Sequence, residues 1–215
     1  KIGELAYRAE VTEFIEPGGM MDQYSSAVGG TIYLESEPKI SIRELYPKLG
    51  AFVLGDSGEP KDTMGILQRC RDNRLTIIQK LKIQNPDFDL HSCDSDFNAE
   101  GLNDDEKVLL EGTIRNRDLL RQALQGLEKD QPDHELIGKL LFEHHSVLRD
   151  VLKVSTSKIE TMLDAALNAG ALGGKINGSG GGGCMFAMAP DNPQAVAEAI
   201  EKVGGEATII RQADG

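Results

Sequence analysis

Long apolar runs, paired cysteines and an excess of positive charge are all missing from this sequence. No stretch of 18 or more apolar residues occurs, so no segment is expected to span a membrane. The three cysteines, Cys70, Cys93 and Cys184, lie far apart without a C-x-x-C pair. This spacing is neither a disulfide framework nor a zinc site, and it fits a reducing compartment. We therefore expect a cytoplasmic protein without a structural metal.

Basic residues are scarce relative to acidic ones. Lys and Arg together number 23 against 35 Asp and Glu, which gives a formal net charge of −12. A field of that sign repels phosphate backbones and anionic lipid, so neither nucleic acid nor a membrane surface is an expected partner. A bound anion would need local backbone dipoles or a neighbouring cation.

What is present is the composition of a globular protein. The chain has 215 residues, of which 40% are hydrophobic and 27% charged, and this length suggests one domain or one and a half. Hydrophobic periodicity and turn residues predict the helices and strands. The expected helices cover 4–14, 20–28, 63–82, 104–130, 134–151, 157–169 and 193–203, and the expected strands cover 31–34, 51–54, 172–176, 184–188 and 207–210.

Helix ends are marked by capping residues. Asn103 and Asp133 each precede a helical segment, and Ser157 with Glu160 three residues later forms a capping-box pattern. Gly170 is expected to stop the helix that Ser157 opens. The mixture of helices and hairpin-connected strands, with few β-α-β crossovers, predicts an α+β sandwich of one sheet with helices on one face.

Glycine is concentrated in one place. Eight of the 24 glycines fall between Gly170 and Gly183. Successive glycines allow neighbouring N–H groups to point the same way and let a phosphate approach without interference from Cβ atoms. The alternative is a β-hairpin loop or a close approach of two backbones. The loop is neither a Walker loop nor a dinucleotide fingerprint, because no Gly-Lys-Ser/Thr follows it and a strand, not a helix, comes next.

A second candidate is the acid in the segment Gly19-Met-Met-Asp-Gln-Tyr24. Asp22 falls in the first turn of an expected helix, where an acid commonly serves only to stabilise the helix end. An aspartate held rigidly there could also accept a proton from a substrate hydroxyl. The residues alone leave both roles open.

Four segments together carry a family resemblance. The run G-M-M-D-Q at 19–23 and the glycine-rich run at 170–184 resemble two motifs of the GHMP kinases, the family of galactokinase and of homoserine, mevalonate and phosphomevalonate kinases. The helix at 137–150, followed by Val-Ser, is similar to the galactokinase segment written L-M-x-E-S-H-x-S-L-R-D. The strand and loop ending at 55–61 resemble the family's D-[TS]-G-x-x-[KH]. The segments occur in the family's order and span nearly the whole chain.

The resemblance implies a fold and a domain division. Residues 46–215 are expected to form the GHMP kinase C-terminal domain, a ferredoxin-like antiparallel sheet with helices on one face. Residues 1–45 are expected to be the end of the family's N-terminal α+β domain. Neither the family's first substrate motif nor its P-x-x-x-G-L-x-S-S-A phosphate loop occurs here. We therefore expect the chain to be the C-terminal portion of a larger kinase, lacking most of the ATP site.

The resemblance also implies a chemistry. The intact protein would transfer the ATP γ-phosphate to a sugar hydroxyl with Mg²⁺, as a galactokinase-like enzyme. Asp22 matches the family's catalytic acid, and Lys61 is placed where it could meet a phosphate or the substrate, although a solvated lysine is an equal alternative. The loop that shapes the nucleotide and substrate site would consist of Gly178, Ser179, Gly180, Gly181, Gly182 and Gly183.

Two rival functions stay open alongside the sugar kinase. Ser179 and Gly182 depart from the usual galactokinase loop and favour mevalonate or heptose-phosphate relatives, which makes mevalonate kinase the nearest alternative. A galactokinase-like sensor that binds its ligands without turnover is the other. The expected partners are ATP and a sugar or other small alcohol, and the sequence does not predict an oligomeric state. His145 aligns with a family histidine and is expected to be held by a carbonyl, and His144 is expected in the core.

Overall fold

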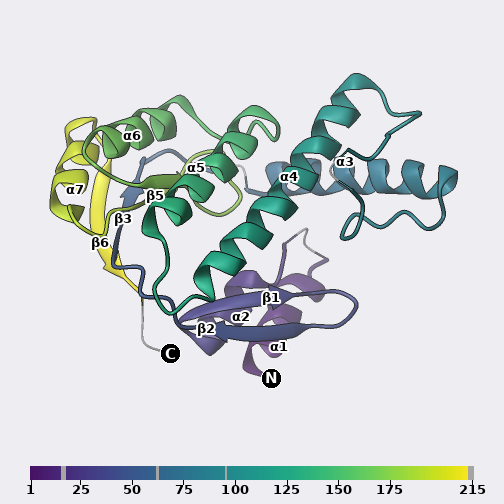
Figure 1. Ribbon diagram of the computed structural model, residues 1–215, viewed down its shortest axis with the longest axis horizontal. Coiled ribbons are helices and arrows are strands. Elements are labelled where there is room, and N and C mark those ends of the chain that lie inside the picture. Colours follow the sequence, from purple (N-terminus) through teal and green to yellow (C-terminus); the bar gives the residue numbers. More distant parts are fainter. Residues whose placement is uncertain (16–17, 62, 95, 213–215) are drawn as a thin grey trace.

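The computed structural model describes residues 1–15, 18–61, 63–94 and 96–212. It contains both the predicted helices and the predicted strands, arranged around a four-stranded sheet with a smaller two-stranded sheet beside it (Figure 1). The elements follow the order α1 (Ile2–Tyr7), a π-helical segment η1 (Arg8–Thr12), α2 (Met21–Val28), β1 (Thr31–Glu35), β2 (Ser41–Leu45), β3 (Ala51–Asp56), α3 (Thr63–Gln84), α4 (Asp104–Leu127), α5 (His134–Asp150), α6 (Ser157–Asn168), β4 (Gly173–Ile176), β5 (Cys184–Met188), α7 (Pro193–Lys202) and β6 (Glu206–Arg211).

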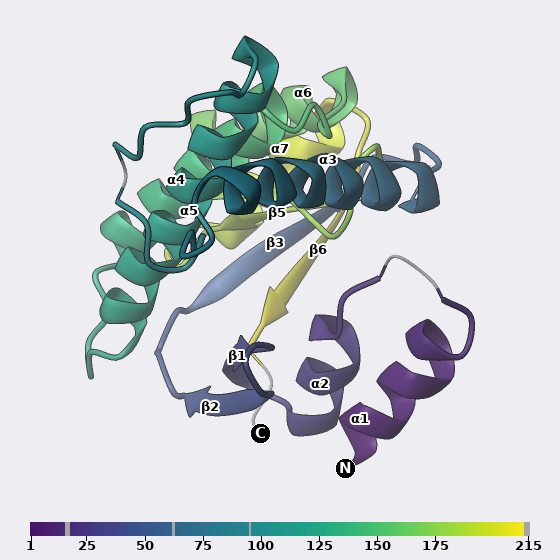
Figure 2. The same ribbon diagram turned by 90° about the vertical axis from the view of Figure 1, so that its right-hand side faces the viewer.

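The four-stranded sheet has the order β4-β5-β3-β6, and every neighbouring pair is antiparallel. Strand β5 lies between β3 and β4, and β3 lies between β5 and β6, so two β-α-β units interlock. This is the ferredoxin-like arrangement that the family resemblance implies, with α6 and α7 on one face, and the α+β class is confirmed. Helix α5 adds a layer on the other face, where Ile137 packs with Met188. Figure 2 shows β3 and β6 running side by side beneath the helices.

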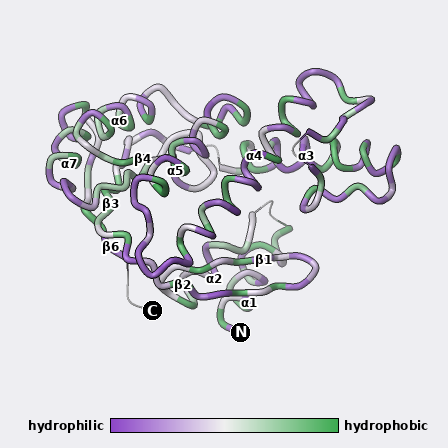
Figure 3. The backbone as a smooth tube through the Cα atoms, in the orientation of Figure 1, coloured by the Kyte–Doolittle hydropathy of each residue, from purple (hydrophilic) through white to green (hydrophobic). Residues whose placement is uncertain are grey.

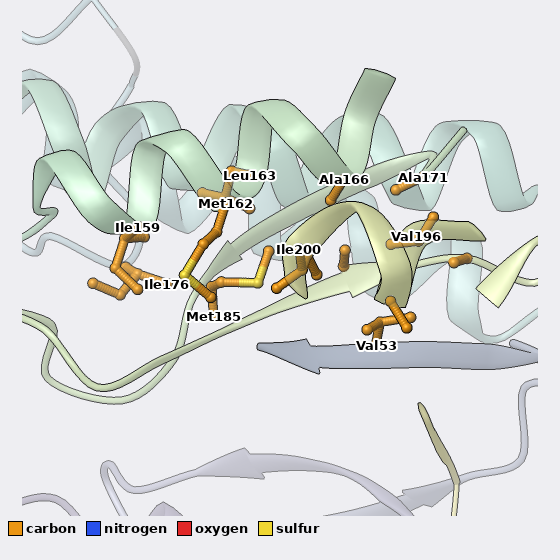
Figure 4. Close-up of a cluster of buried hydrophobic side chains, with 13 residues drawn as sticks. Val53, Ile159, Met162, Leu163, Ala166, Ala171, Ile176, Met185, Val196 and Ile200 are labelled. Atoms are coloured by element: carbon orange, nitrogen blue, oxygen red, sulfur yellow. The ribbon is translucent and has the colours of Figure 1, made fainter. Parts of the chain in front are cut away.

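The main core lies between this sheet and helices α6 and α7. Alternate residues of the strands, including Val53, Ile176 and Met185, face these helices and are fully buried. They meet Met162 of α6 and Ile200 of α7, and Figure 4 shows the Met162 and Met185 side chains pointing toward one another. Burying a side chain of this size contributes roughly 1.5–3 kcal/mol, so this layer is a main source of stability.

Helix α5 packs against the edge strand β4 through two glycines. A Cβ atom on Gly138 would lie 2.5 Å from the carbonyl oxygen of Leu172, and one on Gly173 would lie 1.8 Å from the carbonyl oxygen of Gly138. Only residues without side chains allow the two backbones to approach this closely. The contact holds α5 beside the strand that leads into the glycine-rich loop.

Helices α3 and α4 form an arm that extends away from the sheet, at the right of Figure 1. The arm has its own apolar cluster, which also includes residues of the long connection between the two helices. Hydrophobic and hydrophilic stretches alternate along both helices in Figure 3, as they do in amphipathic helices. The buried members of the cluster are Ile77, Leu81, Phe88, Leu102, Leu110 and Ile114.

The N-terminal region forms a separate small layer. Helices α1 and α2 pack together, and β1 pairs with β2 from Thr31 opposite Leu45 to Glu35 opposite Ser41. The sequence predicts β1 but not β2, because Ser41–Leu45 lacks the apolar alternation that marks a strand, and in the structure the segment is mostly exposed. Pairing with β1, and not an apolar face, makes this segment extended.

The helix caps agree with the sequence in two cases and differ in one. Asn103 and Glu106 form a capping box on α4, and the Asp133 side chain accepts a hydrogen bond from Leu136 N at 3.0 Å. At α6 the predicted box of Ser157 and Glu160 is wrong, because the cap is Thr156, one residue earlier. Glu160 is drawn away from the helix end by other partners, described below.

Among the described residues, no helix is both long enough and apolar enough to cross a lipid bilayer.

Candidate functional site

The glycine-rich loop joins β4 to β5 and closes with a hydrogen bond from Asn177 N to Cys184 O at 2.8 Å. Its glycines adopt backbone angles that other residues rarely reach, with φ between +68° and +121°. This conformation is available to glycine without the steric cost of a Cβ atom. The five glycines in that region of φ are Gly178, Gly180, Gly181, Gly182 and Gly183.

The segment after β3 anchors one side of this loop. Ser57 donates from both its backbone N and its Oγ to the carbonyl oxygen of Gly183, at 2.9 and 2.6 Å. Gly183 N in turn donates to Glu59 O at 3.0 Å. The D-S-G segment and the glycine loop, which lie more than 120 residues apart in the sequence, therefore form one unit.

Lys61 lies directly on this unit. Its Nζ is 3.4 Å from the carbonyl oxygen of Asn177, and its aliphatic stem covers Gly183, where a Cβ atom would come within 1.9 Å of Lys61 Cε. On the same side, the hydroxyls of Ser179 and Thr63 are 3.5 Å apart. The structure thus brings Lys61 and Ser179, both named from the sequence, to the same loop.

The turn between α5 and α6 holds the loop through a second set of contacts. Gly181 N donates to Val154 O at 2.7 Å, and Val154 N donates to Leu148 O at 3.0 Å. Gly180 packs so closely here that a Cβ atom on it would lie 2.5 Å from Val154 O. The loop is therefore held on two sides by backbone hydrogen bonds, which fixes its shape before any ligand arrives.

A buried histidine contacts the last residue of β4, directly before the loop. His145 is fully buried, its Nε2 is 2.8 Å from Glu160 Oε1, and its Nδ1 is 3.3 Å from Ile176 N. Glu160 also accepts hydrogen bonds from the Ser155 hydroxyl and, at 3.2 Å, from Arg149 Nη1. The expectation of a carbonyl partner for His145 is wrong: a carboxylate and a backbone N–H hold the ring.

The charge state of this network follows from its surroundings. Burial lowers the pKa of His145, and the hydrogen bond and charge of Glu160 oppose that shift only in part. Burial raises the pKa of Glu160, but the hydrogen bonds from Ser155, His145 and Arg149 outweigh it and leave the pKa below its ordinary value. Near pH 7 His145 is therefore neutral, and Nδ1 accepts from Ile176 N while Nε2 donates to the Glu160 carboxylate.

The loop retains backbone donors that the protein does not use. Within the described residues, the N–H groups of Gly178, Ser179, Gly180 and Gly182 have no hydrogen-bond acceptor. Unused N–H groups on successive residues of a turn, such as Gly178, Ser179 and Gly180, can receive an anion such as a phosphate. The nearby ammonium of Lys61 adds the positive charge that the acidic protein as a whole lacks.

Asp22 lies on a different element. It occupies the first turn of α2 and is exposed, and no hydrogen bond or ion pair of its carboxylate occurs in the described part of the chain. Figure 2 shows α2 in the N-terminal layer, below the helices that cover the sheet. No hydrogen bond or ion pair in the described residues joins Asp22 to the glycine loop. Its role as the catalytic acid thus stays a prediction from the sequence.

The donors needed for a resident metal ion do not gather here. Among residues 1–15, 18–61, 63–94 and 96–212, no three His, Cys, Asp or Glu side chains lie close enough together to hold one. Asp56, the acid next to the loop, accepts a hydrogen bond from Gly58 N at 2.9 Å instead.

Sequence reasoning missed the contribution of Glu160, Ser155 and Val154. Glu160 lies three residues after Ser157, and this spacing predicts a capping role and not a contact with His145. The neighbouring Thr156 supplies the cap, and this frees Glu160 to bind His145 fifteen residues earlier. A backbone contact such as that of Val154 does not depend on residue type, so the sequence does not predict it.

Known proteins can now be compared with this site. Residues 120–206 match the family described as GHMP kinases C terminal. The mevalonate kinase of Pyrococcus abyssi is 47% identical over 210 residues, 97% of this chain and 54% of that protein. The galactokinase of Streptomyces coelicolor is 31% identical over 217 residues, 94% of this chain and 54% of that protein. The chain spans about half the length of the curated relatives it matches.

A solved structure shows the same fold. The Lactococcus lactis galactokinase complexed with galactose aligns with a TM-score of 0.71 and 18% identity, over 96% of this chain and 57% of that one. At this identity the likeness concerns the fold alone. The family itself is identified by the match of residues 120–206 and by the sequence identities given above. The chain contains a GHMP kinase C-terminal domain.

Proposed function

We propose that this chain is part of an ATP-dependent kinase whose acceptor is mevalonate. The observation that carries the proposal is the 47% identity to the Pyrococcus abyssi mevalonate kinase along 97% of this chain, against 31% to the Streptomyces coelicolor galactokinase. Ser179 and Gly182, the two loop positions that depart from the usual galactokinase pattern, agree with this choice. We also propose the division into 1–45, the end of an N-terminal domain, and 46–215, the C-terminal domain.

The residues of the glycine loop would hold phosphate. The unused N–H groups of the loop and the Lys61 ammonium fit an anion. ATP supplies the phosphoryl group that is transferred. Because most of phosphoryl-transfer catalysis is positioning and charge stabilisation, a loop fixed by Ser57, Glu59 and Val154 before binding is well suited to it.

Asp22 would handle the proton of the acceptor. As the acceptor oxygen bonds to the γ-phosphorus and the bond to the ADP oxygen breaks, the hydroxyl loses its proton, and an ionised carboxylate can accept it. Mg²⁺ is expected for the family, where it neutralises phosphate charge. The described acids do not group into a magnesium site, so no step assigned to this chain depends on the ion.

A second acceptor class has its own support. The run Gly19-Met-Met-Asp-Gln23 resembles the galactokinase motif, and the Streptomyces coelicolor galactokinase aligns along 94% of the chain. A sugar hydroxyl is therefore the second candidate acceptor. The chemistry of transfer would be the same for both.

The test is ADP release by the full-length protein with ATP and Mg²⁺, using mevalonate and galactose as separate acceptors. We expect turnover with mevalonate and a loss of about a thousandfold in kcat for Asp22→Asn, the size of effect that loss of a general base produces. Asp191→Asn, the same change at an exposed acid in the turn before α7, is the matched control and should leave kcat unchanged.

The other outcomes decide between the rivals. Turnover with galactose alone would replace mevalonate by a sugar. Nucleotide binding without turnover on either acceptor would favour the non-catalytic sensor. Equal kcat values for Asp22→Asn and the wild type would remove Asp22 from the mechanism while leaving the kinase assignment intact.

A further inference from the structure

A second concave site lies on the sheet face opposite α6 and α7. It is a cavity of about 500 Å³ between the sheet and helices α4 and α5, with α3 at its edge. Phe52 and Phe186 form its floor, and leucines of the helices, including Leu120 and Leu141, form its walls. No residue of the glycine loop lines it. Its size lies within the usual range for small-molecule sites, about 300–1,000 Å³.

The charged side chains that line this cavity are both positive. Its lining contains Arg74 and Arg117, together with His144, which is neutral near pH 7, and no Asp or Glu among the described residues. Lys175 adds a further cation, because its Nζ lies 5.2 Å from the centre of the Phe186 ring. In a chain with 35 acids and 23 Lys and Arg, an apolar cavity that only basic side chains border runs against the overall composition.

Two of the polar groups are available for a ligand. Arg74 Nε donates to Cys70 O at 2.8 Å, and its two terminal nitrogens have no partner within the described residues. Asn116 Oδ1 is buried without a hydrogen bond. Rotation of that amide by 180° would present its NH₂ group instead, so the same side chain can donate to an acceptor. Arg117, in contrast, already binds Leu90 O and Cys93 O at 2.8 and 2.7 Å.

From this placement we propose that the cavity binds an amphipathic carboxylate, a molecule with one apolar chain and a terminal carboxylate. The apolar chain would lie against Phe52, Phe186 and the leucines. The carboxylate would be bound by the guanidinium of Arg74, whose planar fork matches carboxylate geometry. This site is separate from the glycine loop, and the proposal does not depend on the identity of the phosphoryl acceptor.

Calorimetric titration of the protein with octanoate, 1-octanol and butanoate tests the proposal. We expect octanoate to bind at one site with a Kd below about 1 mM. The neutral 1-octanol should bind at least about tenfold more weakly because it cannot form the charge-assisted contact, and butanoate should bind more weakly because it buries less apolar surface.

Variants assign the contact to the cavity. Arg74→Gln should weaken octanoate binding about tenfold and leave 1-octanol unchanged. Arg71→Gln, the same change on the same helix outside the cavity, should alter neither. Ala123→Phe fills the cavity and should abolish binding of both ligands, provided its circular dichroism matches that of the wild type.

Three results would overturn the proposal. These are no saturable octanoate binding to the wild type, equal affinity for octanoate and 1-octanol, or equal loss of octanoate binding in Arg74→Gln and Arg71→Gln. The arginine pair decides the question even if Ala123→Phe fails to fold, because both arginines are partly or fully exposed and neither change alters the core.

Discussion

At the scale of single residues, Gly180 of the β4–β5 loop and Gly58 of the segment after β3 differ in why each must be glycine. Gly180 has φ of +84° and lies so close to the α5–α6 turn that a Cβ atom would meet Val154 O at 2.5 Å. Gly58 has a similar φ of +70°, but a Cβ atom there would meet nothing within 4 Å. Substitution of these two glycines therefore distinguishes the cost of backbone strain from the cost of a steric clash.

We predict that Gly180→Ala lowers the free energy of unfolding by roughly 3 kcal/mol, because strain and a clash with backbone atoms add. Gly58→Ala should lower it by only about 1 kcal/mol, since strain alone acts. Urea titration followed by circular dichroism measures both values. Equal losses would show that the loop can move away from Val154, and that the α5–α6 turn does not fix its shape.

At the scale of elements, the cap of α6 is one residue earlier than the sequence pattern predicts, at Thr156 instead of Ser157. The Thr156 hydroxyl accepts from Ile159 N at 3.3 Å and donates to Glu59 Oε2 at 2.5 Å. It therefore caps α6 and joins it to the segment that anchors the glycine loop. Ser157, the cap predicted from the sequence, is exposed and lies within the helix.

Thr156→Ala is predicted to lower the free energy of unfolding by about 1–2 kcal/mol, because both the cap and the bond to Glu59 are lost. Ser157→Ala should change it by less than about 0.5 kcal/mol, as exposed substitutions usually do. Thermal or urea unfolding of the two variants gives the comparison. A larger effect at Ser157 than at Thr156 would identify Ser157 as the cap of α6.

At the scale of the whole molecule, global stability should depend on pH through His144. Burial, followed by the charges of Lys175 and His145, lowers the pKa of His144 from 6.5 to about 4. Between these two values the unfolded chain binds a proton that the folded protein does not. Its contribution to stability is therefore complete above about pH 6.5 and is lost as the pH falls toward 4.

We predict that the free energy of unfolding falls by up to about 3 kcal/mol from this group between pH 7 and pH 4. In His144→Gln that part of the pH dependence should disappear, and the curve should be flatter than that of the wild type. Urea titrations at half-unit pH intervals measure it. Parallel curves for the two proteins would mean that His144 titrates alike in the folded and unfolded states.

Local features of the chain were predictable from residue type. Asn103 and Asp133 cap their helices as expected, because a cap depends on a side chain and an N–H group only two or three residues apart. The β5 and α7 segments begin at the expected Cys184 and Pro193. The glycine cluster predicts a loop with an unusual backbone conformation. The order of the four motif segments along the chain indicates the family.

Only the tertiary structure shows which contacts form between residues that lie far apart in the sequence. The sequence does not show that Glu160 binds His145, that Val154 holds Gly181, or that Ser57 and Lys61 contact the glycine-rich loop. These contacts depend on backbone groups or on partners far along the chain, and many residue types could make them. The sequence by itself determined most of the elements and two of the three predicted caps, because short-range interactions fix those, and its motifs indicated the family. Only the fold determined how the loop is held and where the basic apolar cavity forms, because both arise where separate elements meet.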